Sequence, residues 1–208
     1  MKEKVSAIID ILQQRYPDAL CALQYEKDYE LMIAVRLSAQ CTDARVNLVT
    51  PALFAAYPSL DAMAGAEIAD VEHYIHSCGF YRQKAKDIVQ ACQMLIDKFD
   101  RKVPDTMEQL LTLPGVGRKT ANLLLGDIYN QPGSVVCDTH CIRICGRLGL
   151  SEGKEPEKVE QQLRKILPPE QSNDFCHRIV LFGREVCTAR APKCDACPLA
   201  IHCKYITG

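Results

Sequence analysis

The 208-residue sequence lacks any apolar run that approaches the roughly 18 residues needed to span a bilayer. Its first residues, MKEKVSAIIDILQQRYP, also lack a secretory pattern, because their apolar stretch is short and is interrupted by Asp10 and Gln13. We therefore expect a soluble, cytoplasmic protein without membrane segments.

The sequence has no excess of either charge, since 25 basic residues face 26 acidic ones and the formal net charge is −1. This balance neither indicates nor excludes nucleic-acid binding, because phosphate binding requires a local basic patch rather than a basic total. Hydrophobic residues make up 48% of the chain and charged residues 25%, which argues against a disordered chain and a coiled-coil rod.

The alternating pattern that is typical of strands is nearly absent, and helical periodicity dominates instead. Val5, Ile8, Ile9 and Leu12, for example, share one face of a first helix. We expect an all-α protein with about ten short helices. The other expected helices cover residues 28–39 with Asp28 as the cap, a segment from 42 or 43 that Pro51 kinks or divides, 67–78, 81–99, about 105–112 with Asp105 as the cap, 118–129, about 138–148 with Asp138 as the cap, 156–167 and 175–186.

A cluster of chain-breaking residues, NQPGS at residues 130–134, separates two of the expected helices. A chain of this length suits one or two domains. We therefore expect a domain boundary at this cluster.

The segment LPGVGRKT, at residues 113–120, lies between two expected helices. Its proline and its glycines, Gly115 and Gly117, permit a tight backbone hairpin. The free amides of such a hairpin and of the following helix form a site for a DNA phosphate. A contact of this kind positions a duplex without reading its sequence. The alternative is a plain turn, although a plain turn does not usually need two glycines followed by Arg-Lys-Thr.

Two residues near this hairpin and the breaker cluster suggest covalent chemistry. Lys119 falls in the first turn of an expected helix, where the helix dipole and partial desolvation favour the neutral amine. A neutral lysine is a nucleophile that can form a Schiff base. Asp138 begins another expected helix, so it is a carboxylate that works with Lys119, a helix N-cap, or both.

Twelve cysteines without a secretory signal indicate reduced thiols that are buried or bind metal. We interpret most of the eight scattered cysteines as small buried hydrophobes. These are Cys21, Cys41, Cys78, Cys92, Cys137, Cys141, Cys145 and Cys176.

The other four cysteines, Cys187, Cys194, Cys197 and Cys203, lie within 17 residues of one another. Structural zinc sites usually take two close pairs separated by a longer spacer, whereas this loop has one close pair between two single cysteines. The compact loop therefore favours a [4Fe–4S] cluster, with zinc and free thiols as the alternatives.

These motifs, in this order, resemble those of the endonuclease III family of bifunctional DNA glycosylases. The resemblance covers nearly the whole chain. The hairpin and the aspartate are shared with a wider superfamily, but Lys119 together with the cysteine loop narrows the match, because the adenine-mismatch glycosylases lack a lysine at this place. The further segments that carry the resemblance are LMIAVRLSAQCTD at 31–43, GFYRQKA at 79–85 and DTH at 138–140.

The resemblance implies a two-lobed all-α fold. One lobe is a six-helix barrel with a helix-hairpin-helix over residues 22–132, and the other is a discontinuous iron–sulfur domain of residues 1–21 and 133–208. Double-stranded DNA is then expected in a cleft between the lobes. A monomer that associates with the nucleoid when it binds DNA is also expected.

The chemistry that the resemblance implies begins with a damaged, oxidised pyrimidine flipped out of the duplex. Lys119 attacks C1′ and displaces the base, while Asp138 assists deprotonation of the lysine or stabilises charge on the sugar. The resulting Schiff base permits β-elimination, which cuts the strand 3′ to the lesion. The alternatives are a glycosylase with another base preference and a non-catalytic or redox-sensing DNA-binding module.

The resemblance also implies several DNA contacts. Gln40 matches the residue that fills the gap left by the flipped nucleotide, or else is a surface glutamine. Phe80 matches a wedge position where leucine is usual, or else is a core aromatic. Arg36 stands where the family usually has an apolar residue, and the sequence offers no account of it. The remaining expected contacts are Leu113, Gly115 and Gly117 in the hairpin and Arg190 and Lys193 in the cysteine loop, a pair that is otherwise a solvated face.

Overall fold

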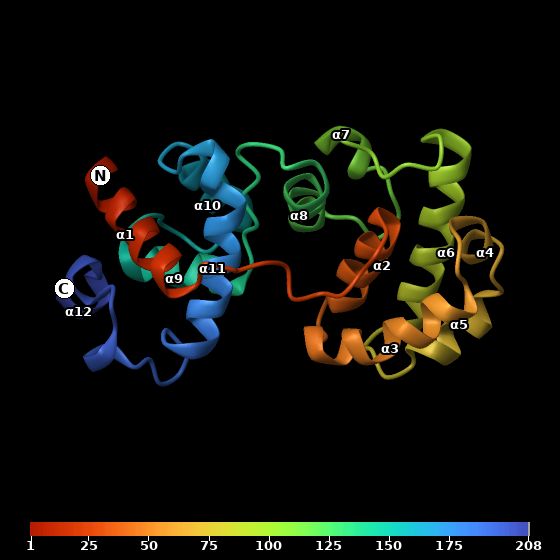
Figure 1. Cartoon of the computed structure of the whole chain (residues 1–208), viewed down its shortest axis with the longest axis horizontal. Coiled ribbons are helices and arrows are strands. Elements are labelled where there is room, and N and C mark those ends of the chain that lie inside the picture. Colours follow the sequence, from red (N-terminus) through yellow and green to blue (C-terminus); the bar gives the residue numbers. More distant parts are fainter. Residues whose placement is uncertain (208) are drawn as a thin grey trace. The chain divides into compact units, whose positions relative to one another are not determined.

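The computed structural model describes residues 1–207, and over that range it contains helices and no strand (Figure 1). The all-α class expected from the periodicity is confirmed. No helix in the described part of the chain combines the length and the apolar character that a bilayer crossing requires.

The chain forms two compact units. One is Ala22–Tyr129, and the other joins Met1–Cys21 to the chain from Asn130 onward. The division falls at the first residue of the breaker cluster, whereas the expected boundary was after residue 132. Asn130 and Gly133 both have positive φ, at 48° and 78°, so the chain turns sharply here.

The unit Ala22–Tyr129 is built around α2 and α6, which pack on each other (Figure 1). α4 and α5 also pack on α6, while α3 and α8 pack on α2. Where six helices were expected, this fully described unit has seven, because the five-residue α4 was not expected. They are α2 (Asp28–Ser38), α3 (Asp43–Ala56), α4 (Leu60–Ala64), α5 (Ile68–Ile75), α6 (Tyr81–Lys98), α7 (Met107–Leu110) and α8 (Arg118–Tyr129).

Three details of this unit differ from the expectation. Thr106, not Asp105, is the N-cap of α7, and its side chain accepts a hydrogen bond from Gln109 N.

The start of α2 also differs, because Lys27, not Asp28, is its N-cap. The start of the helix is held by the Glu30 carboxylate, which accepts hydrogen bonds from the backbone N–H of Glu26 at 2.9 Å and of Lys27 at 3.2 Å. Pro51 lies inside α3 without dividing it.

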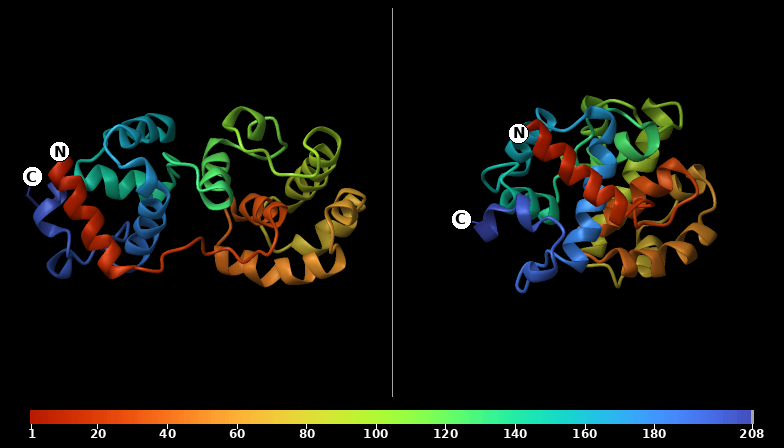
Figure 2. Two further views of the ribbon diagram at one scale, coloured as in Figure 1. Left: turned by 45° about the horizontal axis from the view of Figure 1, so that its top comes forward. Right: turned by 60° about the vertical axis from the view of Figure 1, so that its left-hand side comes forward.

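The other unit is centred on α11, against which both α1 and α9 pack. On α1 the four apolar residues at helical spacing, Val5, Ile8, Ile9 and Leu12, are all buried, as expected. Figure 2 shows α1 beside α11, which follows it by more than 150 residues in the sequence. The helices of the described part of this unit are α1 (Lys2–Arg15), α9 (Thr139–Leu148), α10 (Pro156–Arg164), α11 (Ser172–Glu185), α12 (Lys204–Thr207) and the 3-10 helices η1 (Pro169–Gln171), η2 (Cys194–Ala196) and η3 (Ala200–His202).

Candidate functional site

A tight hairpin joins α7 to α8. Backbone hydrogen bonds from Leu113 N to Leu110 O and from Val116 N to Leu113 O, both 3.1 Å, close its two turns. The side chains of Leu113 and Val116 are buried, whereas Gly115 and Gly117 are exposed. The apolar side chains therefore anchor the hairpin, and Leu113 has only its backbone to offer to a ligand.

Gly115 must be a glycine for two reasons. Its φ of +75° lies in the left-handed region, and a Cβ at this position would lie 2.5 Å from Arg36 Nε and 2.9 Å from Asp87 Oδ2. Arg36 and Asp87 form an ion pair of 2.6 Å between Nη2 and Oδ2. The arginine that the sequence left unexplained thus packs directly against the hairpin.

Lys119 is the second residue of α8, directly after the hairpin. The helix ladder begins with the hydrogen bond from Ala121 N to Gly117 O at 2.9 Å, so the N–H groups of the preceding residues lie at the open end of the helix. The Lys119 side chain is exposed, whereas partial desolvation was expected for it. An exposed amine at a helix N-terminus suits a negatively charged ligand.

Asp138 is the N-cap of α9, as expected. Its Oδ1 accepts a hydrogen bond of 2.7 Å from Cys141 N, and its Oδ2 lies 3.2 Å from His140 Nδ1. The carboxylate side chain is only 17% exposed. One oxygen therefore fixes the helix start, while the other is held beside an imidazole.

From the sequence, His140 was assigned no role. The glycine at position 183, inside an expected helix, is the one sign in the sequence that a side chain packs closely there. Gly183 lies in the last turns of α11, where a Cβ would be 2.5 Å from His140 Cδ2. A glycine inside a helix is unfavourable by itself, which makes it a sign of close packing. Here it leaves room for the imidazole that meets Asp138.

α9 also connects Asp138 with the cysteine loop. Arg147, in its last turn, donates from Nη1 to Cys187 Sγ at 3.2 Å and to Thr188 O at 2.9 Å. Arg143, one turn earlier, donates from Nη2 to Cys187 O at 3.0 Å. The helix that Asp138 caps therefore holds the first cysteine of the loop from two sides.

The four loop cysteines carry free thiols, and three of them act electrostatically on the fourth, Cys197. Cys187 and Cys203 are buried, and Cys194 and Cys197 are partly exposed. Burial raises the pKa of Cys197, and the neighbouring Cys187, Cys203 and Cys194 raise it further. Four cysteine thiolates are the donor set of a [4Fe–4S] cluster, so the chemistry of these residues fits such a cluster.

Gln40 and Phe80 are exposed neighbours on the unit Ala22–Tyr129. Both have left-handed backbones, with φ of 54° and 59°. Gly79, the residue before Phe80, lies against Gln40. A Cβ added to Gly79 would be 3.6 Å from Gln40 O. The Phe80 side chain is 68% exposed, which excludes the alternative that it is a core aromatic.

Comparisons with known proteins identify the family of this chain. Residues 33–169 match the model of the HhH-GPD superfamily base excision DNA repair proteins, and residues 187–203 match the iron–sulfur binding domain of endonuclease III. Endonuclease III of Synechocystis sp. is 46% identical over 202 residues, which are 97% of this chain and 92% of the relative. The chain belongs to the endonuclease III family. It is therefore an enzyme of the DNA glycosylase and abasic-site lyase class, with a [4Fe–4S] cluster as its cofactor.

Further relatives of this endonuclease III family member extend the match. Endonuclease III of Escherichia coli is 37% identical and covers 98% of this chain and 96% of its own length. A solved structure of a trapped endonuclease III–DNA covalent intermediate has a TM-score of 0.93 at 40% identity and covers 100% of this chain and 97% of its own. A thermostable thymine-DNA glycosylase, with a TM-score of 0.86 at 18% identity, shares the fold.

Other residues expected at the site are accessible but are not tested by these comparisons. Arg190 and Lys193 are both exposed in the loop between the first two cluster cysteines. A hydrogen bond of 3.0 Å from Lys193 N to Val186 O ties this loop back to the end of α11. Their contact with DNA stays a prediction.

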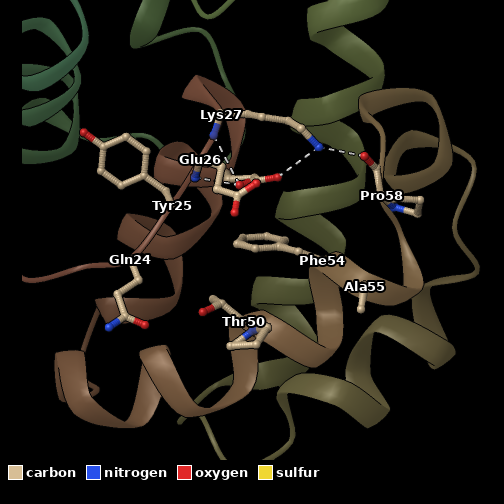
Figure 3. Close-up of a pocket in the computed structure, with 10 residues that line it drawn as sticks. Gln24, Tyr25, Glu26, Lys27, Thr50, Phe54, Ala55 and Pro58 are labelled. Atoms are coloured by element: carbon tan, nitrogen blue, oxygen red, sulfur yellow. Dashed lines mark hydrogen bonds and ion pairs between the residues drawn. The ribbon is translucent and has the colours of Figure 1, made fainter.

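A pocket of about 610 Å³ in the unit Ala22–Tyr129 contains none of the predicted site residues (Figure 3). Its walls include Phe54 and Glu30, and Lys27 Nζ reaches across it to Pro58 O at 2.8 Å. Lys27 Nζ also lies 3.3 Å from Glu30 Oε1. The pocket is therefore not part of the site at which the predicted chemistry takes place.

The scattered cysteines of this endonuclease III family member are mostly buried, as expected. Cys21 and Cys41 are the partly exposed exceptions. The buried ones are Cys78, Cys92, Cys137, Cys141, Cys145 and Cys176.

Proposed function

We propose that this protein removes oxidised pyrimidines from double-stranded DNA and then cuts the strand 3′ to the abasic site by β-elimination. The observation that carries the proposal is the exposed amine of Lys119, held in the first turn of α8 immediately after the hairpin. A relative of 40% identity has been trapped as a covalent DNA intermediate, which supports covalent chemistry by this chain as well.

In the proposed reaction, the nitrogen lone pair of Lys119 forms a bond to C1′ of the flipped nucleotide. The bond from C1′ to the base breaks, and its electron pair leaves with the base. Loss of a proton from nitrogen and opening of the sugar give a Schiff base. This iminium acidifies the C2′ proton, whose removal expels the 3′ phosphate and cuts the strand.

Asp138 is the residue that we assign to proton transfer and charge stabilisation in this reaction. Its Oδ1 is engaged by Cys141 N, but its Oδ2 faces the imidazole of His140 at 3.2 Å. A carboxylate near the sugar stabilises the positive charge that develops as the base departs, or accepts a proton from Lys119. His140 orients that oxygen.

The DNA is proposed to bind through features of both units. The backbone of the hairpin, with Gly115 and Gly117 exposed, and the N-terminus of α8 bind phosphate. Gln40 and Phe80 enter the duplex where the nucleotide has left it. Arg190 and Lys193 contact phosphates from the cysteine loop, whose shape the cluster maintains when it is bound.

A borohydride trap tests the proposal. The holoenzyme is mixed with duplex DNA that contains thymine glycol or an abasic site, and the mixture is reduced. Covalent adducts with both substrates are expected for the natural protein, and none for Lys119→Gln. Lys86→Gln, which removes another exposed lysine of the same unit, is the matched control and should form both adducts.

Each other outcome contradicts part of the proposal. An adduct with abasic DNA alone would retain the lyase but assign it another damaged base. No adduct with either substrate, from protein that carries its cluster, would favour a DNA-binding module. A normal adduct with Lys119→Gln would show that another amine is the nucleophile.

We also propose that the protein is a cytoplasmic enzyme that binds DNA of the nucleoid as a monomer. Size-exclusion chromatography of the complex tests whether one copy binds per duplex.

A further inference from the structure

Lys84 is an almost completely buried lysine that has no part in the proposed reaction. Its side chain is 1% exposed and lies in the first turns of α6. Burial lowers the pKa of Lys84, while the neighbouring thiols of Cys78 and Cys41 raise it. Burying an ammonium is unfavourable unless hydrogen bonds compensate for the lost water. Its partners therefore indicate what the lysine contributes.

The partners are two backbone carbonyls at the end of α2. Lys84 Nζ donates to Leu37 O and to Ala39 O, both at 2.7 Å. The last carbonyls of a helix lack partners within the helix, and they carry the negative end of its dipole. The ammonium thus ties down the chain on both sides of Ser38, the last residue of α2.

The same residue is bonded to the start of its own helix. Phe80 is the N-cap of α6, and the backbone N–H of Lys84 donates to Phe80 O at 3.1 Å. Lys84 therefore links the carbonyl of Phe80 with the carbonyl of Ala39, the residue that precedes Gln40. In the proposed function, the side chains of Phe80 and Gln40 enter the duplex.

Both positions have backbones that need such support. The left-handed φ of Gln40 and of Phe80 is uncommon for residues other than glycine, and it persists only where the surrounding structure enforces it. Gln40 and Phe80 are both exposed. Loss of the two side-chain hydrogen bonds of Lys84 would free the end of α2, which leads into Gln40, and would detach it from the start of α6.

We infer that Lys84 is a positioning residue that presents Gln40 and Phe80 together to the DNA duplex by holding the end of α2 against the start of α6. The inference rests on the proposed function, because it assumes that these two side chains enter the duplex. It assigns Lys84 no contact with substrate. Its effect is on how well the gap in the duplex is filled, not on the lysine chemistry at Lys119.

The test uses a duplex in which a tetrahydrofuran analogue of an abasic site lies opposite 2-aminopurine. The analogue cannot form a Schiff base, so the fluorescence reports unstacking of the opposite base without any reaction. Saturating natural protein is expected to raise the fluorescence. Lys84→Met, which fills similar space but has no donor, should lower that amplitude several-fold while cluster content stays unchanged.

Controls and kinetics separate positioning from general damage. Lys86→Met removes an exposed lysine two residues further along α6 and should retain the natural amplitude. In single-turnover assays on a damaged duplex, Lys84→Met should slow base removal by up to about 100-fold, as misplacement by about 1 Å does. The Lys119 adduct with a preformed abasic site should be much less affected.

A folded Lys84→Met protein with natural amplitude would overturn the inference. Should that variant not fold, Lys84→Gln takes its place, because its shorter side chain cannot reach both carbonyls. Its amplitude should be below natural, and an equal amplitude would overturn the inference. No fluorescence change with the natural protein would instead refute the proposed insertion of Gln40 and Phe80, and this inference with it.

Discussion

Arg36 and Asp87 form a mostly buried ion pair that lies against the backbone of the hairpin. The arginine donates to Asp87 Oδ2 from Nε at 2.8 Å and from Nη2 at 2.6 Å, and the two side chains are 17% and 10% exposed. Gln83 Nε2 donates to the other carboxylate oxygen at 2.7 Å. α2 and α6 therefore brace Gly115 through their side chains rather than through apolar packing.

Removing the arginine alone should destabilise the protein, because Asp87 would remain buried without its partner. We expect Arg36→Met to lower the free energy of unfolding by about 3 kcal/mol. The double variant Arg36→Met/Asp87→Leu should recover most of this loss. Urea unfolding of the two single variants and the double variant measures the coupling, and strict additivity would contradict it.

The hairpin glycines should respond differently to the addition of a methyl group. Gly115→Ala places a Cβ 2.5 Å from Arg36 Nε on a left-handed backbone, so we expect a loss of about 1–3 kcal/mol of stability and weaker DNA binding. Gly117→Ala is the control for stability, because no atom lies within 4 Å of its Cβ position. Equal unfolding midpoints for the two variants would disprove the steric argument.

Local signals predicted much of the fold. The helix α8 has the bounds that its periodicity predicts, and Asp138 caps α9 through its side chain as an N-cap aspartate should. The five-residue α4 was missed, because a helix so short has too few turns for an apolar period to stand out. Pro51 was expected to kink or divide α3, and it does not divide the helix, which runs from Asp43 to Ala56 through the proline.

The site was predictable only where its chemistry is local in sequence. The hairpin and the cysteine loop each lie within one short segment, so their spacing is visible. The contact of Lys84 with Leu37 spans 47 positions, and that of Arg36 with Asp87 spans 51. No local pattern encodes such pairs. The exposure of Lys119 was also missed, because burial depends on what packs around the helix end.

The buried thiol of Cys92 should make stability fall in alkaline solution. Burial raises its pKa from 9.0 to about 12, so between these values the native protein keeps a proton that the unfolded chain has lost. Stability therefore decreases as the pH rises through this window, by up to about 1.4 kcal/mol per pH unit. Urea unfolding of the natural protein and Cys92→Ala at about pH 8 and about pH 10 checks this.

The comparison between the two proteins isolates the contribution of this one thiol. Cys92→Ala should be less stable at the lower pH, because it leaves a small cavity. The difference between the two proteins should then shrink by about 1 kcal/mol at the higher pH. A constant difference across the window would mean that the thiol titrates normally in the native state.

Arg147 should help to retain the cluster. Its Nη1 donates to Cys187 Sγ at 3.2 Å, and its Nη2 donates to Ala189 O at 3.1 Å, so Arg147→Met loosens both a ligand and its loop. Loss of such an outer partner typically weakens metal binding by about 10- to 100-fold. Iron release to a chelator should therefore be faster than from Lys165→Met, an exposed change in the same unit. Equal release rates would contradict the role of Arg147.

The two roles of Asp138 can be separated by a single pair of substitutions. Asn is as good an N-cap as Asp, so Asp138→Asn should keep the hydrogen bond from Cys141 N and change stability by no more than a few tenths of a kcal/mol. Asp138→Ala removes that acceptor and should cost about 1 kcal/mol.

The rate of base removal should depend on the negative charge of Asp138 and not on its role as the N-cap of α9. Both variants lack the carboxylate oxygen that faces His140, so both should slow base removal by about 100-fold or more. Urea unfolding and single-turnover rates on the same preparations give the two measurements. If Asp138→Asn retained the natural rate, Asp138 would be a helix cap alone, and another group would have to stabilise the charge on the sugar.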